Sequence, residues 1–309
     1  MDIERVTVVV PVRNAESTIE ICLRSLMKQN FTKLEVIVVD NMSTDNTREK
    51  TARYPVTLIE EKRINSYIAR NTGIREASGE VIAFTDSDCI ATPEWISWLV
   101  KNYSDANVGG AGGQILPYTN YKTRNVVEKY TISARCYPAY PYKTREPMVL
   151  QRRKGILLAG VLFTANASYR KPILDKLGGF DEHLKSGGDI DMSYRVQDLG
   201  YKITWDPKAI VYHIQRSTCK DLIGQYFRYG TCVAPLVRKH FEDKRYFIVE
   251  HYFNIVKNML TFACRLFKSP FYKGDKYLYL ITPILSNLTL IALIMGKFYG
   301  NLRVRVFIL

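Results

Sequence analysis

The sequence predicts an α/β fold: a mostly parallel sheet flanked by helices, followed by a C-terminal helical region associated with a membrane. Short apolar runs of the kind that form buried strands alternate with helical segments over most of the chain. Several of these runs end in polar or acidic residues, as strands do at a sheet edge that binds a ligand. The last third of the chain is basic and carries one long apolar segment.

The composition is that of an ordinary globular protein of 309 residues, with 47% hydrophobic and 24% charged residues. Six scattered cysteines form no CxxC pair and no metal-ligand spacing. Cys22 and Cys89 lie in apolar runs, where we expect buried free thiols, and we expect a reducing location on the cytosolic side. We expect no signal peptide, because the apolar run Val6–Val10 comes too early and lacks a basic leader. The net charge of +14 is concentrated in residues 201–309, which suits anionic lipid, nucleic acid or phosphorylated ligands.

The first part of the chain has the strand–helix alternation that builds a parallel sheet. Val6–Pro11 (VTVVVP) is mostly apolar, as in a strand buried on both faces. Ala15–Gln29 then carries apolar residues at the spacing of one helix face. Further along, we expect strands at Leu34–Asp40, at Val56–Glu60 and from Val81, and helices after the polar turn Asn41–Thr47 and at Asn65–Ala77.

The middle of the chain continues this pattern less regularly. Its glycine-rich run, Val108–Leu116, suits a strand that another backbone approaches closely. The other expected elements are helices at Pro93–Tyr103, Tyr121–Tyr137, Pro172–Leu177 and Asp189–Arg195, strands at Leu158–Ser168, Lys202–Trp205 and Ala209–Tyr212, and loops at Tyr137–Tyr142 and Arg152–Gly155.

From Thr218 the strand–helix alternation gives way to expected helices that mix basic and large apolar residues. We therefore expect two domains, at 1–217 and 218–309. Asp221–Lys239 and Tyr246–Phe267 are expected to be helices that mix basic and large apolar residues. Tyr277–Gly296 then runs for 20 residues without a charge, long enough to cross a bilayer core of about 30 Å. Flanking basic and aromatic residues favour membrane contact over a buried or dimer-forming helix, and leave open whether the segment spans the bilayer or lies at its surface.

The expected strand that begins at Val81 ends abruptly in the polar sequence Thr-Asp-Ser-Asp, which contains Asp86 and Asp88. Burying two carboxylates just past the end of a buried strand costs free energy unless each has a partner. Mg²⁺ or Mn²⁺ prefers oxygen ligands and usually reaches proteins together with substrate phosphates. The alternative is a pair of aspartates that cap the next helix.

Four segments, in order, carry a resemblance to a known family. They are Val10–Glu16 (VPVRNAE), Val38–Thr47 (VVDNMSTDNT), Ala69–Gly73 (ARNTG) and Asp86–Asp88 (DSD). Together they make the chain similar to inverting family 2 glycosyltransferases of the GT-A type, over roughly residues 5–230. The resemblance implies a GT-A (Rossmann-like) fold, a nucleoside-diphosphate sugar as donor and a divalent metal, Mn²⁺ or Mg²⁺.

The resemblance also implies a set of residues that bind the donor. Asp40 would contact uracil or an equivalent base. Arg70 would pair with diphosphate oxygens, although a surface salt bridge is the alternative. The expected donor-binding residues are Pro11, Arg13, Asn14, Glu16, Asp40, Ser43, Asp45, Arg70, Asn71, Asp86, Gln225 and Arg228.

For the metal, the resemblance implies Asp88 as a direct ligand, with Asp86 touching the ribose or reaching the ion through water. His213 matches the frequent third ligand of the family, and a partly buried histidine at a sheet edge is the alternative. Such an ion neutralises the diphosphate as the glycosidic bond breaks.

Inversion needs a base that takes the acceptor hydroxyl proton opposite the leaving group. Asp189 fits the family's base position, in the stretch GGDID that precedes Arg195. Many members have Glu-Asp where this chain has Gly188-Asp189, so Asp191 remains an alternative base. Either acid could instead serve the first turn of a helix, held by Arg195 or by the helix dipole.

Gln225–Tyr229 (QYFRY) resembles the QxxRW motif of processive polysaccharide synthases, with Tyr in place of Trp. A processive synthase needs a pore of several spanning helices, so we prefer a metal-dependent, hexosyl-type transferase that adds one sugar to a glycan or polyprenyl-linked acceptor. It would work at the cytoplasmic side of the cell membrane and contact the membrane surface. The other interpretations are a processive synthase and an inactive nucleotide-binding scaffold that binds lipid or nucleic acid. Because the acids are retained and no nucleic-acid module is present, we expect no nucleic-acid partner.

Overall fold

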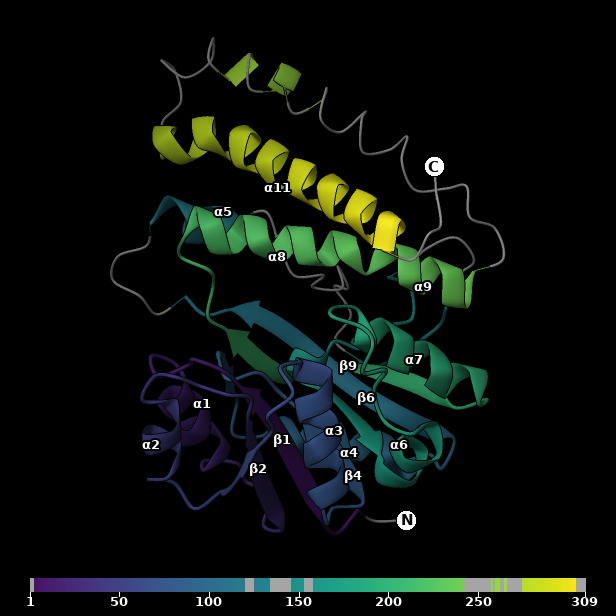
Figure 1. The fold of residues 1–309 in the computed structure, drawn as a ribbon. Helices are drawn as coiled ribbons and strands as arrows, with labels where there is room; N and C mark the ends of the chain where they lie inside the picture. Colours follow the sequence, from purple (N-terminus) through teal and green to yellow (C-terminus); the bar gives the residue numbers. More distant parts are fainter. Residues whose placement is uncertain are drawn as a thin grey trace. The chain divides into compact units, whose positions relative to one another are not determined.

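The computed structural model describes residues 3–119, 125–133, 146–152, 158–241, 257, 259–261, 264–265 and 274–303. The chain forms two compact units (Figure 1). The first comprises Met1–Tyr118 and Pro138–Ile214, and the second comprises Thr119–Tyr137 and Gln215–Leu309. A division into domains at residues 217/218 stays a prediction.

The first unit contains a nine-stranded sheet with the order β3-β2-β1-β4-β8-β6-β9-β5, in which β7 also pairs with β9. The strands are β1 (Val6–Val12), β2 (Leu34–Asp40), β3 (Thr57–Glu60), β4 (Val81–Phe84), β5 (Cys89–Ala91), β6 (Val108–Pro117), β7 (Met148–Leu150), β8 (Ala167–Arg170) and β9 (Lys202–His213). Strands β3, β2, β1 and β4 are parallel, as predicted. Beyond β4 the sheet is mixed: β8 is antiparallel to β4 and β6, β6 is parallel to β9, and β5 and β7 are antiparallel to β9.

Helices flank this sheet, which confirms the predicted α/β class. They are α1 (Ile19–Leu26), α2 (Thr47–Thr51), α3 (Ser66–Glu76), α4 (Trp95–Lys101), α6 (Lys171–Leu177) and α7 (Gly188–Asp198), with 3-10 turns at Asn102–Ser104 and Thr164–Asn166. The side chain of Asn65 caps α3 by accepting a hydrogen bond from the Tyr67 amide. Gly178 ends α6 in the left-handed region, at φ 69°, which glycine adopts without strain.

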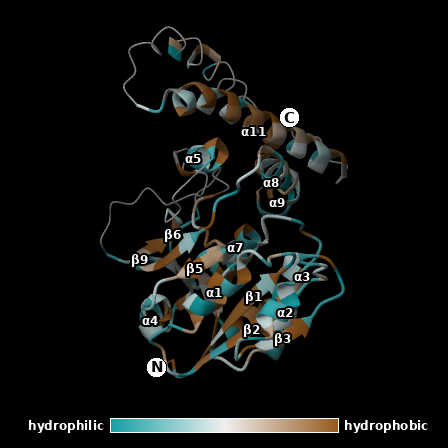
Figure 2. Cartoon of the chain, turned by 90° about the vertical axis from the view of Figure 1, so that its left-hand side faces the viewer, coloured by the Kyte–Doolittle hydropathy of each residue, from teal (hydrophilic) through white to brown (hydrophobic). Residues whose placement is uncertain are grey.

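The core of the first unit lies along β1 and its neighbours. Every residue of β1 and β4 is buried, and Val8, Val9 and Val10 have no exposed surface. Figure 2 shows the apolar residues concentrated in β1 and β2. A strand covered by helices on both faces needs an apolar run rather than an alternating pattern, which is why these strands could be predicted from the sequence.

The predicted strand at Leu158–Ser168 is wrong for most of its length. Within it, residues 158–160 form a turn, Thr164–Asn166 is a 3-10 turn, and the strand begins only at Ala167. In this segment, hydrogen bonds between side chains and the backbone replace the ladder that a neighbouring strand would form. The amide of Leu162 donates to Ser193 Oγ at 2.9 Å, and Asn166 Nδ2 donates to the carbonyl of Ala209 at 2.8 Å.

Two other predicted boundaries differ from the structure. The two short strands expected around Pro207 are one strand, β9, whose register with β6 shifts between Gly113 and Gln114. Gly113 permits this bulge, because a Cβ there would lie 1.9 Å from the Ala209 carbonyl oxygen. The single helix expected at Asp221–Lys239 is broken at Cys232, because Pro235 lacks the amide that would continue the hydrogen-bond ladder.

The second unit is helical in its described part, with α5 (Val126–Ser133), α8 (Cys219–Thr231), α9 (Val233–His240) and α11 (Lys276–Arg303). Helices α8 and α11 lie side by side (Figure 1), and glycines allow their close approach. A Cβ on Gly296 would lie 2.1 Å from the Phe227 carbonyl oxygen, and one on Gly230 would lie 2.1 Å from the Leu293 carbonyl oxygen. Of the helix expected at Tyr121–Tyr137, the structure describes residues 125–133, which contain α5. Most of the segment expected at Tyr246–Phe267, and most of the expected loops, lie outside the described residues.

Helix α11 is longer than the predicted apolar segment 277–296, and its two faces differ. Its buried face carries small and medium residues: Leu285, Thr289, Ala292, Gly296 and Gly300. Large apolar side chains are exposed on the other face: Ile284, Leu288, Ile291, Met295, Phe298 and Leu302. In the described part of the chain, Tyr277–Leu302 is the one stretch long and apolar enough to cross a membrane.

Candidate active site

The strands of the first unit bring the predicted polar residues to one edge of the sheet. Strands β1, β2 and β4 are parallel. Strand β9 runs in the same direction as β4: β8 is antiparallel to both β4 and β6, so β4 and β6 share a direction, and β9 is parallel to β6. Their carboxyl ends therefore share an edge, which gathers Asp40, the turn after Phe84, and His213.

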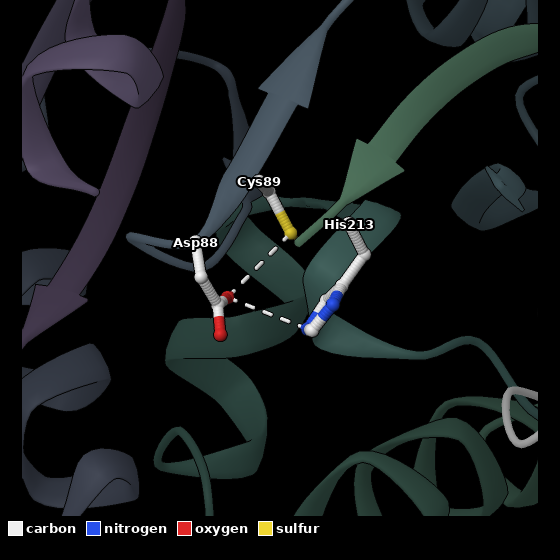
Figure 3. A group of neighbouring side chains, drawn as sticks. All are labelled: Asp88, Cys89 and His213. Carbon is white, nitrogen blue, oxygen red and sulfur yellow. Dashed lines mark hydrogen bonds and ion pairs between the residues drawn. The ribbon is translucent and has the colours of Figure 1, made fainter. Parts of the chain in front are cut away.

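Asp88 and His213 form a pair at this edge. His213 Nε2 lies 3.4 Å from Asp88 Oδ1, and the Ile214 amide donates to the Asp88 carbonyl at 2.9 Å. The imidazole is buried, whereas Asp88 keeps some exposure. Cys89, which we did not predict as a site residue, lies opposite His213 in the β5–β9 ladder and points toward the same pair (Figure 3). The signal in the sequence was a cysteine directly after the second aspartate.

These side chains fit a divalent metal ion. The ligand atoms of Asp88, Cys89 and His213 all lie within 4.8 Å of one another. Carboxylate oxygen and imidazole nitrogen are ligands that Mn²⁺ and related ions accept. Burial raises the pKa of the Cys89 thiol well above its ordinary value, so without a metal this group is a neutral thiol.

Asp86 has a different partner. Its Oδ1 lies 2.6 Å from Arg70 Nη2, in an ion pair whose arginine is buried. Helix α3 supplies this arginine, whose guanidinium also lies 5.6 Å from the centre of the Tyr67 ring. Among the described residues, Arg70 Nε has no hydrogen-bond partner. A buried guanidinium with a spare N–H can donate a hydrogen bond to an anionic oxygen of a ligand.

Asp189 lies at the start of α7, after Gly187, which adopts a left-handed conformation at φ 77°. The Ile190 amide donates to Asp189 Oδ1 at 3.0 Å. Burial raises the pKa of Asp189 to about 6, Arg70 lowers it in part, and the charge of Asp86 raises it. Asp189 is therefore close enough to Arg70 and Asp86 for both charges to act on it, and its role as the base stays a prediction.

Asp191 has other surroundings. Its side chain has no exposed surface, and its Oδ2 lies 2.8 Å from Arg195 Nε. Arg195 also donates to the carbonyls of Leu177 and Gly179, at 2.9 and 2.8 Å. Asp191 therefore holds an arginine that ties α7 to the end of α6.

The segment that leads into α7 is fastened to α3. Asn71 Nδ2 donates to the Phe180 carbonyl at 2.8 Å, and Asn71 Oδ1 accepts from the Phe180 amide at 2.7 Å. Asn65 Nδ2 donates to the carbonyls of Glu182 and Leu184, both at 2.9 Å. Asn71, one of the expected donor-binding residues, thus uses its side-chain amide to hold this segment. We did not predict a role for Asn65, whose only signal was its place before a helix.

The turns after β1 and β2 hold each other through residues that we expected to bind the donor. The Asn14 amide donates to Ser43 Oγ at 2.9 Å, and the Glu16 amide donates to Asp45 Oδ2 at 3.1 Å. Glu16 in turn accepts from the Asn46 amide at 3.2 Å. Pro11 is buried within β1, and Arg13 is exposed beside this pair of turns.

Asp40 ends β2 beneath these turns and is buried. Its Oδ2 accepts from the Ser43 amide at 3.2 Å. Among the described residues, its Oδ1 has no hydrogen-bond partner. A buried carboxylate oxygen without a donor is costly, so a ligand N–H at this place would stabilise the fold as well as bind.

Gln225 and Arg228 lie on α8 of the second unit. Gln225 Nε2 donates to the Tyr229 hydroxyl at 3.0 Å. Burial lowers the pKa of Arg228, and the neighbouring Arg216 lowers it further. A role for either residue in donor binding stays a prediction.

Residues 7–178 match the model of the family described as Glycosyl transferase family 2. The chain is 32% identical over 234 residues to glycosyltransferase AglE of Haloferax volcanii, covering 73% of this chain and 71% of the relative. It is 25% identical over 248 residues to the O-antigen chain rhamnosyltransferase RfbN of Salmonella typhimurium, covering 77% of this chain and 76% of the relative. A mannosyltransferase from Pyrobaculum calidifontis, PcManGT, solved with GDP-Man and Mn²⁺, superposes with a TM-score of 0.59 at 20% identity, over 96% of this chain and 86% of that chain.

Proposed function

This chain belongs to glycosyl transferase family 2 and has the GT-A fold, and from that premise we propose that it is an inverting, metal-dependent hexosyltransferase. It would move one sugar from a nucleoside-diphosphate sugar to an acceptor hydroxyl in each reaction. The observation that carries the proposal is that the Asp88–His213 pair lies at the same sheet edge as Arg70, Asp86 and Asp189. Transfer of a sugar with inversion needs a group that binds the donor diphosphate, a cation that neutralises it and a base for the acceptor hydroxyl, and this edge offers a candidate for each.

The nucleotide would bind against the ends of β1 and β2. The unpaired Oδ1 of Asp40 is placed to accept an N–H of the base. Asn14, Ser43, Asp45 and Glu16 hold the surrounding turns through the contacts between them, so we assign these four residues to the shape of the pocket.

Asp88 and His213 would hold the divalent ion, and Asp86, kept in place by Arg70, would reach the ion or the ribose through water. Bound there, the ion neutralises the charge that develops on the diphosphate. The spare Nε–H of Arg70 would donate to a phosphate oxygen.

Asp189 would be the base. Because its Oδ1 already accepts from the Ile190 amide, we assign the proton to Oδ2. As the acceptor oxygen bonds to the anomeric carbon, its proton moves to Asp189 Oδ2, and the bond to the diphosphate breaks with its electron pair leaving on the phosphate oxygen. A pKa of about 6 leaves this aspartate ionised at neutral pH, yet more basic than an exposed carboxylate. Asp191 would position α7 through Arg195.

We place the acceptor at a membrane surface. The relative RfbN is by its name an O-antigen chain transferase, so a glycan or polyprenyl-linked acceptor is the class that we propose for this chain. The large apolar side chains on the exposed face of α11 would bring the enzyme to the cytoplasmic side of the membrane. We favour single addition, because a pore for a growing polymer needs several spanning helices and the described part of the chain has one candidate.

The test is release of nucleoside diphosphate from a panel of UDP-, GDP- and dTDP-sugars, with Mn²⁺ or Mg²⁺ and then with EDTA, beside membrane extracts that supply acceptor. We expect metal-dependent release from one donor, loss of release in Asp88→Ala, and a fall of about 10²–10⁴-fold in kcat for Asp189→Asn with donor binding retained. The stereochemistry of the product, read by NMR, tests inversion.

Donor binding measured by calorimetry separates the possible failures. If no donor binds to the wild-type chain with or without metal, the chain is a scaffold rather than a transferase. If donor binds and turns over equally well in EDTA, metal dependence is wrong. A product with retained anomeric configuration would remove Asp189 from the role of base.

A further inference from the structure

We propose that Cys89 is a ligand of the same metal ion as Asp88 and His213, so that the site takes a transition-metal ion in preference to Mg²⁺. The inference rests on the metal site of the proposed function and adds one residue to it. From the sequence alone, Cys89 was expected only to be a buried free thiol.

The sheet places Cys89 and His213 together. They are directly opposite each other in the antiparallel ladder between β5 and β9, so both side chains leave the sheet on the same face. Both are almost fully buried, at 1% and 3% exposure. Figure 3 shows the sulfur and the imidazole converging on the carboxylate of Asp88, which comes from the turn before β5.

The distances suit one ion shared by three ligands. Asp88 Oδ1 lies 3.4 Å from His213 Nε2 and 4.0 Å from Cys89 Sγ. Around a tetrahedral ion with ordinary bond lengths, an oxygen and a nitrogen ligand are separated by about 3.4 Å, and an oxygen and a sulfur ligand by about 3.6 Å. The pair with His213 already matches this separation, and a small rotation of Cys89 would bring the sulfur to it.

This set of ligands determines which metals suit the site. Mg²⁺ requires oxygen ligands, whereas imidazole and thiolate favour Zn²⁺, Co²⁺, Cd²⁺ and, less strongly, Mn²⁺. When the bond from metal to sulfur forms, the thiol proton is released to solvent and the sulfur remains as thiolate. We therefore expect the site to prefer transition metals, and Zn²⁺ or Cd²⁺ to compete with Mn²⁺ for it.

Cys22 provides the matched control. It is as deeply buried as Cys89, and its thiol donates to the Asp86 carbonyl at 3.5 Å, but its sulfur does not belong to the metal-ligand group. If Cys89 were only a small apolar residue in the core, a sulfur-to-metal signal would be no more sensitive to serine at position 89 than to serine at position 22.

The experiment is Co²⁺ titration of the full chain, with and without UDP or GDP, followed by absorption spectroscopy. Cys89→Ser and Cys22→Ser are compared in a background in which the exposed Cys219 and Cys264 are serines. We expect visible d–d bands in every protein. A near-ultraviolet sulfur-to-cobalt charge-transfer band should appear in the background protein and in Cys22→Ser, and be lost in Cys89→Ser.

The outcomes distinguish this inference from the proposed function. If all proteins show the visible bands, but Cys89→Ser has the same charge-transfer absorption as the background protein, then Cys89 is not a ligand. The metal site formed by Asp88 and His213 is then still supported. If no protein shows visible bands, even with nucleotide, then the metal site itself is wrong and this inference falls with it.

A second measurement needs no substitution at the buried Cys89. Cadmium NMR of the background protein separates sulfur ligation, which shifts the resonance far downfield, from ligation by oxygen and nitrogen alone. Where Cys89→Ser does fold, its Cd²⁺ affinity should fall at least about tenfold relative to its Mn²⁺ affinity, because only Cd²⁺ depends strongly on the thiolate. Equal losses for the two metals would contradict the inference.

Discussion

Asp189 and Asp191 are separated by one residue in α7 but have different surroundings. Asp189 meets the charges of Arg70 and Asp86, and its pKa is raised to about 6, chiefly by burial. Asp191 is fully buried against Arg195. Gly188 explains why this chain departs from the Glu-Asp pattern, since a Cβ there would lie 2.7 Å from the Tyr67 ring. A larger side chain at 188 would have to displace that aromatic residue.

Asp189→Asn should stabilise the protein in a pH-dependent way. Because the pKa of Asp189 is raised on folding, the folded state binds the proton more tightly than the unfolded state. The charged carboxylate therefore costs stability above about pH 6, and this cost disappears below about pH 4. Urea unfolding in EDTA should show the Asn variant more stable by about 1–3 kcal/mol at about pH 8, with no difference at about pH 4. A variant destabilised equally at both pH values would contradict the raised pKa.

Asp191→Asn should instead destabilise the fold. It leaves the arginine of a buried ion pair without its charged partner, which typically costs about 3–5 kcal/mol. We expect a lower urea midpoint and reduced activity in proportion to the folded fraction. If Asp191→Asn unfolds like the wild type but loses kcat by more than about a hundredfold, then Asp191 rather than Asp189 is the base.

At the scale of elements, α11 combines a close-packed face with an exposed apolar face. Its buried face packs along α8, which carries Lys220, Asp221 and Arg228. A spanning α11 that kept this packing would carry those charged side chains toward the hydrocarbon, at roughly 3 kcal/mol each near the centre. We therefore expect α11 to lie in the membrane interface, with its exposed side chains in the lipid.

Replacing Ile291 and Met295 with asparagine should weaken membrane binding without unfolding the chain. Both side chains are exposed, at 44% and 60%. The loss of two buried apolar groups from lipid should weaken binding roughly ten- to a hundredfold. Vesicle co-sedimentation measures this, and Met27→Asn, an exposed methionine of the first unit, is the matched control. Unchanged binding would show that another surface attaches the protein.

At the scale of the whole molecule, charge is distributed unevenly along the chain. Residues 201–309 contain 17 Lys and Arg against 6 Asp and Glu, a net charge of +11 out of +14. Most of the second unit belongs to this basic region. We expect the basic residues of this region and the apolar face of α11 to favour the same partner, an anionic membrane.

Binding of the intact protein to vesicles should therefore depend on anionic lipid and on salt. We expect co-sedimentation with vesicles of phosphatidylglycerol and phosphatidylcholine to exceed that with phosphatidylcholine alone, and to weaken as salt rises from about 0.05 to 0.5 M, since screening shortens the reach of the charges. If binding is equal for both lipids at all salt concentrations, then the basic residues do not contribute and the apolar face of α11 alone accounts for membrane binding.

The sequence by itself determined the α/β class, the family, and the turn that carries Asp86 and Asp88. Apolar runs reveal strands that are buried on both faces, and short motifs persist where a loop must hold a nucleotide. It also predicted Asp189 as the base with Asp191 as the alternative, and it gave no information on the different surroundings of these two carboxylates.

Only the tertiary structure decided which side chains meet. The pairing of Asp88 with His213, the placement of Cys89 beside them, and the pairing of Arg70 with Asp86 depend on strand register and on the packing of α3. The wrong strand at Leu158–Ser168 has the same cause, since distant side chains such as Ser193 take its backbone hydrogen bonds. Contacts between residues far apart in the chain leave no periodic signal in the local sequence, so they could not be predicted from it.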